Sequence, residues 1–540
     1  MSYTSLNFLI FVTATMLVYF LFPIKRQKWT VLLAASYIFY LFAGYKYVVF
    51  ILFTTLSTYL IALWVEKISV RSKENIKLHK AEWSREQKKE YKEKIKTRKR
   101  LVMSSALVLN FGLLAFLKYY NFFAGSLNDI FGAFGIGFSA PTLHLLLPLG
   151  ISFYTFQSMG YIVDVYRGKT PAQRNPFKLA LFVSFFPQIV QGPIGIYDSL
   201  AHQLYEPHSF DFTRFKHGAE LILWGLIKKM FIADRAVIAI NTVTADYNSY
   251  GGTALTFTIL LYALQLYADF SGGIDIARGV AQIFGIDMME NFKRPYFSKD
   301  INEYWRRWHI SLGNWFKNYL FYPLAMSSLF INTSKKIKNS KFGSTAAGTH
   351  IAKVLPTGVA SFIVFFIVGI WHGANWKYVG FGVWNGGIIM LSVLLKPVFE
   401  WCHNKLRIDP KTVPYTVFQI IRTFLVVLVG YVFDVAPSFK QAMHTFVLFF
   451  TNQSLSAGWA QISELGLGKK DYLLVLAGAV LIFIISVIQE RHDKTTVREM
   501  LDEKPFILRW LVIFVGIMIL VVFGIYGSGY NASDFVYMQF

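Results

Sequence analysis

The sequence predicts an all-α polytopic membrane protein, with about twelve transmembrane helices and further re-entrant or in-plane helices around a central passage. The 540 residues are 54% hydrophobic and only 16% charged, whereas a soluble domain carries about 25% charged residues. The mean hydropathy is +0.42. Apolar runs of roughly 18 residues or more recur along the chain. We therefore expect one membrane domain over residues 1–540.

The net charge of +23 would suggest a nucleic-acid partner in a soluble protein. Here most Lys and Arg residues fall in short loops between apolar runs, which is the pattern of cytoplasmic loops in membrane proteins. This pattern places a basic arm, residues 67–100, in the cytoplasm and both termini outside. The expected partner is the lipid bilayer, not nucleic acid. The single cysteine, Cys402, excludes intrachain disulfides and cysteine metal cages.

The predicted loops alternate between the cytoplasm and the outside. Two apolar segments fit this alternation only if they enter the membrane and return to the same side: 177–196 and 310–330. The first contains FPQIVQGPIG, whose Pro and Gly residues interrupt helices. Non-helical backbone at membrane depth is tolerated when it is buried in protein or faces a water-filled cavity. The sequence therefore predicts a cavity within the bilayer.

The stretch INEYWRRWHISLGNWF, residues 301–316, combines tryptophan, arginine and histidine in an otherwise apolar chain. Helical spacing predicts that five side chains share one face: Trp305, Trp308, His309, Leu312 and Phe316. An interfacial amphipathic helix with tryptophan anchors would explain the Trp and Arg residues. It would not explain a histidine within the apolar face.

Ionisable residues at membrane depth generally mark function, and two further stretches contain them. GIWHGANW, residues 369–376, contains His372 and Asn375. LQLYADFSGGIDIARG, residues 264–279, contains Asp275, which Arg278 can pair at i, i+3. The alternatives are a core histidine bound to a carbonyl and a purely structural polar cluster, and both stay open.

The two histidines have opposite predicted sidedness. His309 belongs to a cytoplasmic-side segment, and His372 lies near the outer end of its span. A polar passage between them would connect both faces of the membrane and would suit group transfer from an inner donor to an outer acceptor. Histidine, with an ordinary pKa near ~6.5, is the usual general base near neutral pH.

The run NFKRPYFSKDINEYWRRWHISLGNWFKNYLFYPL, residues 291–324, resembles the signature of the membrane-bound O-acyltransferase family. It is most similar to the bacterial branch that contains the alginate O-acetyltransferase membrane subunit. Further similar motifs follow the family's order: LPLGISFYTFQSMGYIVDVYRG, FFPQIVQGPI, WGLIKKMFIADRA, GIWHGANW and FVYMQF. The chain departs from the branch in the arm of residues 67–100, which is longer than expected, and in two motifs. FSGGIDIARG stands where it usually has FSGYSDMAIG, and VFDVA, residues 432–436, stands where it often has VFFRA.

The resemblance implies a multi-helix fold with funnels from both faces that meet near the active histidine. It places the family's near-invariant histidine at His372 and its second histidine at His309. The implied reaction moves an acyl group, most simply acetyl, from a cytosolic thioester to a hydroxyl of an extracytoplasmic polysaccharide or cell-wall polymer. The donor is acetyl-CoA or an acylated carrier protein, with no tightly bound cofactor and no metal. A separate extracytoplasmic acyltransferase or hydrolase-like partner would complete transfer at the bacterial inner membrane, and residues 530–540 would lie on its side.

The residues suit this chemistry. His372 would act as general base, and His309 would orient the donor or hold the thioester oxygen. Asn314 or Asn375 would stabilise the oxyanion, and four cations would bind donor phosphates: Lys293, Arg294, Arg306 and Arg307. The candidate substrate-binding residues are Asn375, Trp305, Trp308, Arg306, Arg307, Asn314, Gln265, Asp269, Ser271 and Asp275. The alternatives are D-alanyl transfer from a carrier protein to teichoic acid, a non-enzymatic polyprenyl-glycan transporter or flippase, and a structural scaffold.

Overall fold

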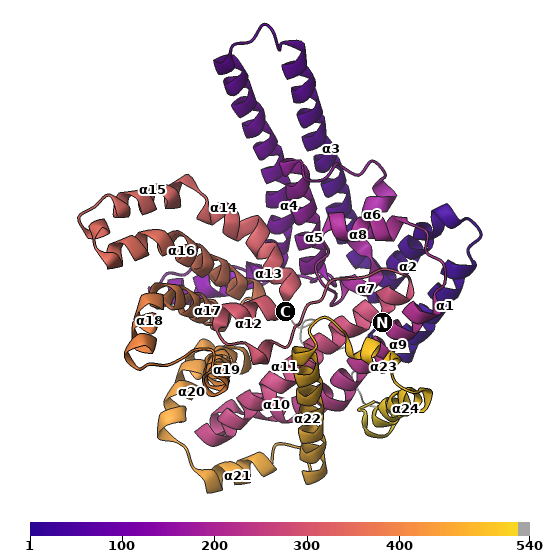
Figure 1. The fold of residues 1–540 in the computed structure, drawn as a ribbon, viewed down its shortest axis with the longest axis vertical. Helices are drawn as coiled ribbons and strands as arrows, with labels where there is room; N and C mark the ends of the chain where they lie inside the picture. The colour runs from indigo at the N-terminus through magenta and orange to yellow at the C-terminus, as the bar shows by residue number, and fades with distance from the viewer. Residues whose placement is uncertain (527–540) are drawn as a thin grey trace. The chain divides into compact units, whose positions relative to one another are not determined.

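The computed structural model describes residues 1–526, in which all regular secondary structure is helical and no β-strand occurs (Figure 1). Within this range, eight helices are long and apolar enough to cross a membrane. This confirms the predicted all-α polytopic class, whereas the count of about twelve crossings stays a prediction. The chain divides into two compact units, Met1–Ile222 with Ala277–Met289, and Leu223–Ile276 with Glu290–Phe540. The single membrane domain likewise stays a prediction.

The first unit contains the N-terminal helices. They are α1 (Leu6–Leu21), α2 (Lys28–Ala43), α3 (Val48–Leu78), α4 (Arg85–Ala133), α5 (Ile151–Arg167), α6 (Pro176–Ser184), α7 (Phe186–Ile189), α8 (Tyr197–Tyr205) and most of α9 (Phe212–Leu226). Helices α3 and α4 lie side by side and extend as a two-helix arm (Figure 1). The basic segment 67–100 forms the end of this arm, where Ser84 and Gln87 make a reciprocal capping box at the start of α4.

The predicted break in segment 177–196 is present. Helix α6 ends at Ser184, Phe185 leaves the helical region (φ −47°, ψ 112°), and α7 is a single turn that begins beside Pro187. The hydroxyl of Tyr3 donates to the carbonyl of Pro187 at 2.9 Å, which satisfies backbone that the break has freed. The segment is almost entirely buried, as irregular backbone at membrane depth requires.

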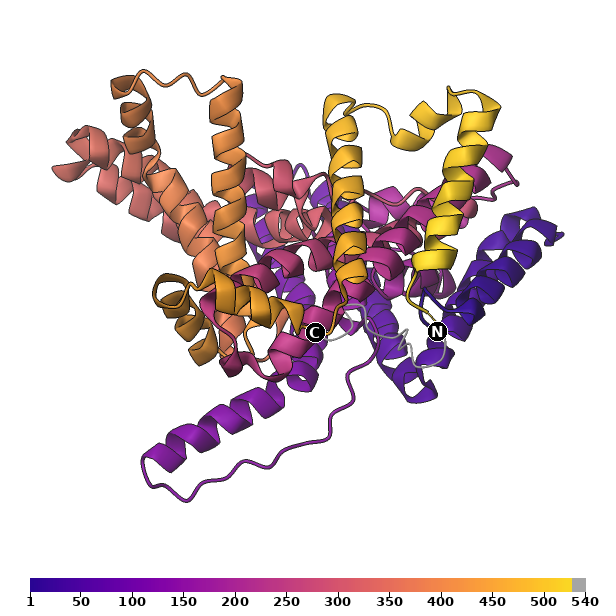
Figure 2. The same ribbon diagram turned by 90° about the horizontal axis from the view of Figure 1, so that it is seen from below.

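The second unit contains the remaining elements. They are the π-helix η3 (Ile227–Ala233), α10 (Asp234–Ala245), α11 (Gly252–Ile283), α12 (Ile301–Arg307), α13 (Ile310–Phe316), the π-helix η6 (Lys317–Phe321), α14 (Tyr322–Ala325), α15 (Ser328–Lys338), α16 (Ala346–His372), α17 (Trp376–Leu394), α18 (Lys396–Lys405), α19 (Val413–Val435), α20 (Phe439–Thr451), α21 (Leu455–Ser463), α22 (Lys469–Arg491), α23 (Val497–Asp502) and α24 (Phe506–Phe523). Figure 2 shows α22 and α24 as neighbouring helices that α23 connects at one end. The last turns of α11 belong to the first unit.

Helices α16 and α17 pack closely because glycines face each other between them. A Cβ atom at Gly369 would lie 2.4 Å from the carbonyl oxygen of Tyr378 and 2.7 Å from the Cα of Gly382. Small residues allow this close approach of backbones in membrane helices. The contact holds the end of α16, which carries His372, against α17.

We expect Gly369→Ala to lower the free energy of unfolding by about 1–3 kcal/mol, because the added methyl overlaps backbone that cannot move aside. The matched control is Gly387→Ala on α17, where nothing lies within 4 Å of the new Cβ. The control should be neutral or stabilising, since alanine favours helices over glycine. The unfolding temperature in detergent measures both, and equal shifts would contradict the packing role of Gly369.

Candidate active site

The stretch 301–316 is not one continuous helix, so the predicted single helical face is wrong. Helix α12 ends at Arg307, and His309 adopts a left-handed conformation (φ 45°) before α13 begins. The cause is Asn291, whose carbonyl accepts from the backbone N–H of Ile310 at 3.0 Å. Its side-chain Oδ1 accepts from the N–H of Ser311 at 2.9 Å. A left-handed non-glycine residue costs on the order of 1–3 kcal/mol, and these bonds hold it in place.

The break turns His309 into the protein interior. Its side chain is only 3% exposed and meets the ring of Phe270 edge-on at 4.8 Å. Its Nδ1 lies 3.3 Å from Oδ1 of Asn291. Burial lowers the pKa of His309 well below its ordinary value, and the nearby charge that His372 can carry lowers it further. His309 is therefore neutral and close enough to His372 for their charges to interact.

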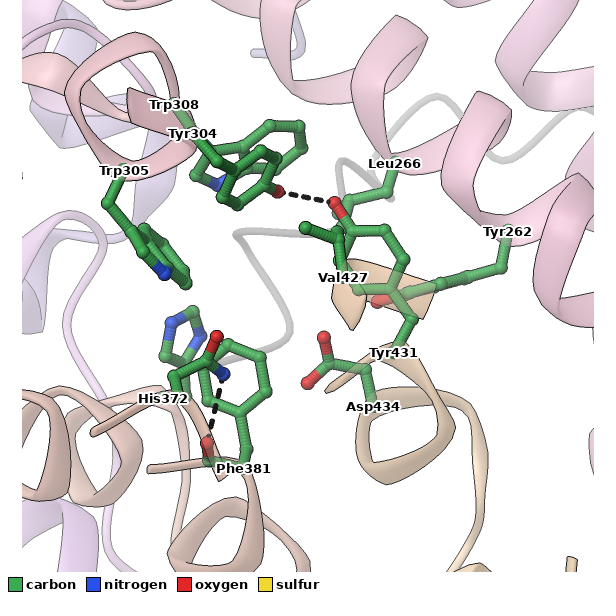
Figure 3. Close-up of a pocket in the computed structure, with 11 residues that line it drawn as sticks. Tyr262, Leu266, Tyr304, Trp305, Trp308, His372, Phe381, Val427, Tyr431 and Asp434 are labelled. Atoms are coloured by element: carbon green, nitrogen blue, oxygen red, sulfur yellow. Dashed lines mark hydrogen bonds between the residues drawn. The ribbon is translucent and has the colours of Figure 1, made fainter. Parts of the chain in front are cut away.

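His372, the last residue of α16, lines a narrow cavity built by five helices (Figure 3). The cavity measures about 20 Å³, which is room for about one water-sized group. The lining residues are Tyr262, Leu266, Tyr304, Trp305, Trp308, His372, Phe381, Asn385, Val427, Tyr431 and Asp434. Two sequence candidates, Trp305 and Trp308, therefore share this space with His372.

A chain of tyrosines fixes the walls of the cavity. The hydroxyls of Tyr304 on α12 and Tyr431 on α19 lie 2.8 Å apart, and the hydroxyl of Tyr296 lies 3.2 Å from that of Tyr431. Tyr296 in turn donates to the carbonyl of Ala263 on α11 at 2.7 Å. Hydrogen bonds between buried groups order the side chains that make them. The chain thus ties α12 and α19 to α11 around the cavity.

Two buried polar atoms of the cavity residues have no hydrogen-bond partner among the residues that the structure describes. They are the indole Nε1 of Trp305 and Oδ1 of Asp434. Figure 3 shows both side chains directed toward the same space as the ring of His372. Leaving such an atom unpaired costs about 1–3 kcal/mol. These two atoms are therefore available to form hydrogen bonds with a polar ligand.

Sequence reasoning missed Tyr431, Asn385 and Asp434 as site residues. The available signal was VFDVA, which puts an aspartate at the end of an apolar run. Two other candidates do not line the cavity. Asn375 caps α17, since its Oδ1 accepts from the N–H of Lys377 at 3.0 Å, and Asn314 is half-buried on α13. Their oxyanion role stays a prediction that the cavity geometry disfavours.

The polar residues of α11 pair with two buried lysines of the π-helix η3. Asp269 lies 2.5 Å from Nζ of Lys229, and Asp275 lies 2.6 Å from Nζ of Lys228. Lys228 also donates to the hydroxyl of Ser271 at 2.8 Å. Of the four candidates on α11, Gln265 is buried, and like the others it does not line the cavity. The structure favours the structural interpretation of this stretch, and substrate binding there stays a prediction.

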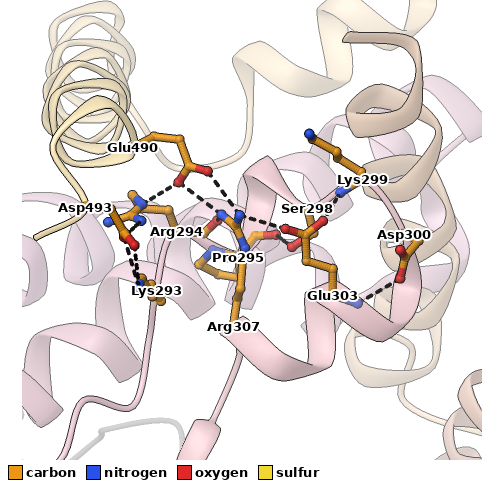
Figure 4. A network of polar contacts seen from close by, with 10 residues as sticks. All are labelled: Lys293, Arg294, Pro295, Ser298, Lys299, Asp300, Glu303, Arg307, Glu490 and Asp493. Atoms are coloured by element: carbon orange, nitrogen blue, oxygen red, sulfur yellow. Dashed lines mark hydrogen bonds and ion pairs between the residues drawn. The ribbon is translucent and has the colours of Figure 1, made fainter. Parts of the chain in front are cut away.

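Three of the four cations predicted to bind donor phosphates already contact carboxylates (Figure 4). Arg307 lies 3.0 Å from Glu490 and 2.7 Å from Glu303. Arg294 lies 2.5 Å from Glu490, and Lys293 lies 2.9 Å from Asp493. Arg294 and Lys293 lower the pKa of Asp493 to about 2. The network disfavours phosphate binding by these three cations, whereas Arg306 is exposed.

We expect Glu490→Gln to lower the free energy of unfolding by about 1 kcal/mol, because it removes the carboxylate shared by Arg294 and Arg307. The value is modest since the pair is partly exposed to solvent. The control is Glu503→Gln, an exposed position just after α23. Unfolding temperatures in detergent should fall for the first variant and stay constant for the second. If the unfolding temperature falls for Glu503→Gln and not for Glu490→Gln, the ion pairs of Glu490 in Figure 4 do not stabilise the fold.

Comparisons with known proteins show which family the sequence resembles. The sequence model of the membrane-bound O-acyltransferase family matches residues 171–347, which include His309. A probable alginate O-acetylase of Pseudomonas syringae pv. tomato is 33% identical over 85% of this chain and 77% of its own length. The peptidoglycan O-acetyltransferase of Helicobacter pylori is 32% identical over 69% of this chain and 64% of its own length.

A teichoic acid D-alanyltransferase of Bacillus subtilis is 30% identical over 55% of this chain and 71% of its own length. All three relatives transfer acyl groups, and the resemblance seen in the motifs is thereby confirmed. The eight apolar helices fit the membrane context of such proteins. This chain therefore belongs to the membrane-bound O-acyltransferase family and is a multi-pass membrane acyltransferase.

Proposed function

We propose that this acyltransferase moves an acetyl group from a cytosolic thioester to a hydroxyl of an extracytoplasmic polysaccharide. The observation that carries the proposal is the aromatic cavity in which His372 faces the two unpartnered polar atoms of Trp305 and Asp434. The alginate O-acetylases, which match most of the chain, support acetyl as the group and a polysaccharide as the acceptor. The family match favours this enzyme over a flippase or a scaffold.

In the proposed reaction, His372 removes the proton of the acceptor hydroxyl while the hydroxyl oxygen bonds to the thioester carbonyl carbon. The indole N–H of Trp305 donates to the oxyanion that forms, in a cavity from which bulk water is excluded. The carbon–sulfur bond then breaks, and its electron pair leaves with sulfur. The imidazolium of His372 returns its proton to the thiolate, so that the products are an ester and a free thiol.

His309 does not line this cavity and would act on it indirectly. Because its ring is buried and neutral, it offers a hydrogen bond without adding a charge that would hinder protonation of His372. Trp305 and Trp308 would shield the thioester from water. Gln265, Asp269, Ser271 and Asp275 would support the site through α11, which also contributes Tyr262 and Leu266 to the cavity.

We place the protein in the bacterial inner membrane with both termini outside, on the distribution of Lys and Arg. A separate extracytoplasmic protein would take part in delivering the acyl group to the polymer. Residues 530–540, proposed to contact it, lie outside the described residues. No tightly bound cofactor is part of the proposal.

D-alanyl transfer from a carrier protein is the second candidate. The arm of α3 and α4 favours it, because this arm presents a dense row of exposed Lys and Arg side chains to the solvent. Such a surface would bind an acidic carrier protein. The same charge also serves membrane orientation, so acetyl-CoA stays the first candidate donor.

In the test, the purified protein in lipid vesicles receives a polysaccharide acceptor together with labelled acetyl-CoA or with a carrier protein charged with D-alanine. We expect thioester consumption and label transfer from acetyl-CoA only, with rates about 10²–10⁴-fold lower for His372→Ala. Consumption of the charged carrier alone would establish the D-alanyl reaction. Consumption of neither donor would refute the acyltransferase mechanism proposed here.

A further inference from the structure

Asp434 is the one carboxylate among the residues that line the cavity of His372. It lies in the last turn of α19, one turn after Tyr431, which also lines the cavity. All other lining side chains except His372 and Asn385 are aromatic or aliphatic. Oδ1 of Asp434 is buried and has no hydrogen-bond partner in the described part of the chain. A carboxylate oxygen in this position is costly unless a donor reaches it.

The ammonium group of Lys377 lies close to Asp434 but does not hydrogen-bond to its Oδ1. Nζ of Lys377 donates to the backbone carbonyls of Asp434 and Ala436, at 2.9 and 3.0 Å. It therefore caps the C-terminal end of α19, where a positive charge is favourable. Its charge also offsets that of the buried carboxylate. Lys377 thus fixes the backbone of Asp434 and leaves Oδ1 directed at the cavity (Figure 3).

Oδ1 of Asp434 needs a hydrogen-bond donor, and this donor would lie beside the hydroxyl that reacts. A carboxylate oxygen accepts hydrogen bonds only, and a carbohydrate offers a second hydroxyl on the carbon next to the one that reacts. We propose that Asp434 binds the acceptor by accepting a hydrogen bond from this neighbouring hydroxyl, which holds the attacking hydroxyl beside His372. The inference rests on the proposed function and specifies its acceptor as a vicinal polyol.

The position of Asp434 explains why similarity to known sequences does not identify the acceptor of this protein. VFDVA, residues 432–436, is one of the motifs in which the chain departs from the branch that it resembles. The departure puts a carboxyl group into the wall of the cavity. Asp434 is therefore a determinant of acceptor specificity and takes no part in bond breaking.

The test separates acceptor binding from donor chemistry. Cells that carry Asp434→Ala or Asp434→Asn are assayed for ester-linked acetate on their extracellular polysaccharide. The purified variants are assayed for slow hydrolysis of labelled acetyl-CoA, in which water replaces the acceptor. We expect Asp434→Ala to reduce polysaccharide acetylation by at least about tenfold, the effect of losing a hydrogen bond to a charged group, while hydrolysis stays within about twofold. Asp434→Asn should retain more, since its amide oxygen still accepts.

Two controls complete the design. His372→Ala should lose both activities, and Asp471→Asn, a half-exposed carboxylate of α22, should lose neither. If Asp434→Ala loses hydrolysis and polysaccharide acetylation equally, or neither, the acceptor role is refuted. If Asp434→Ala does not fold, Asp434→Leu, which keeps the side-chain volume and removes both carboxyl oxygens, decides by the same two assays. If the wild-type protein consumes no acetyl-CoA, the proposed function fails first, and the role of Asp434 falls with it.

Discussion

His372→Ala is expected to reduce acyl transfer by about 10²–10⁴-fold, the usual contribution of a general base. Its imidazole is the basic group that lines the cavity between α12, α16 and α19. Alanine can neither accept the hydroxyl proton nor return it to the thiolate. Because His372 is only half-buried at the end of α16, its removal should leave the fold intact. Initial rates of thioester consumption, with the amount of protein in the membrane, measure the effect.

The matched control is His350→Ala on the same helix. Nε2 of His350 lies 3.2 Å from the carbonyls of both Val393 and Leu394, at the far end of α16 from the cavity. This variant should keep most of its activity and lose some stability. If His372→Ala stays active while His350→Ala does not, the assignment of the general base is wrong.

Lys229→Met is expected to lower the free energy of unfolding by about 3–5 kcal/mol, the cost of leaving a buried charge without its partner. Lys229 is 2% exposed and lies between Asp269 at 2.5 Å and Asp234 at 2.8 Å. Asp269 is fully buried. Without Lys229, its negative charge loses the cation that lies 2.5 Å away in a buried setting. The yield of monodisperse protein in detergent and its unfolding temperature measure the loss.

A double variant tests the pairing itself. Lys229→Met combined with Asp269→Leu removes both charges and should recover a large part of the stability, since a buried ion pair is often no better than apolar residues of similar volume. Lys440→Met, at an exposed site on α20, is the control for loss of a lysine. A double variant less stable than the single one by a further 3 kcal/mol or so would contradict the pairing.

Much of the fold follows from local sequence properties, whereas the site does not. Hydropathy and charge predict the helical membrane class, and Pro and Gly predict the break after α6. The helical face through Trp308 and His309 is wrong because a residue outside the stretch, Asn291, binds the backbone at its centre. Spacing along one helix contains no information on such a distant partner.

The polar residues show the same limit. Asp269 and Asp275 look functional when α11 is considered alone, but their partners lie on η3, about 40 residues earlier. Asp434 looks like a departure from a family pattern and becomes a site residue only when α19 packs beside α12. His372 was found because a histidine in an apolar span is rare and because its motif is distinctive.

The tyrosine chain around the cavity has a consequence for how the protein is made. Tyr296 and Tyr304 are synthesised long before Tyr431, whose hydroxyl bonds to both. A nascent chain that has been synthesised to the end of α17 already carries both histidines, but the wall that α19 supplies has not yet been made. Catalytic competence therefore begins late in translation, when α19 enters the membrane and joins α12. A protein cut short before Val413 should insert its histidines and remain inactive.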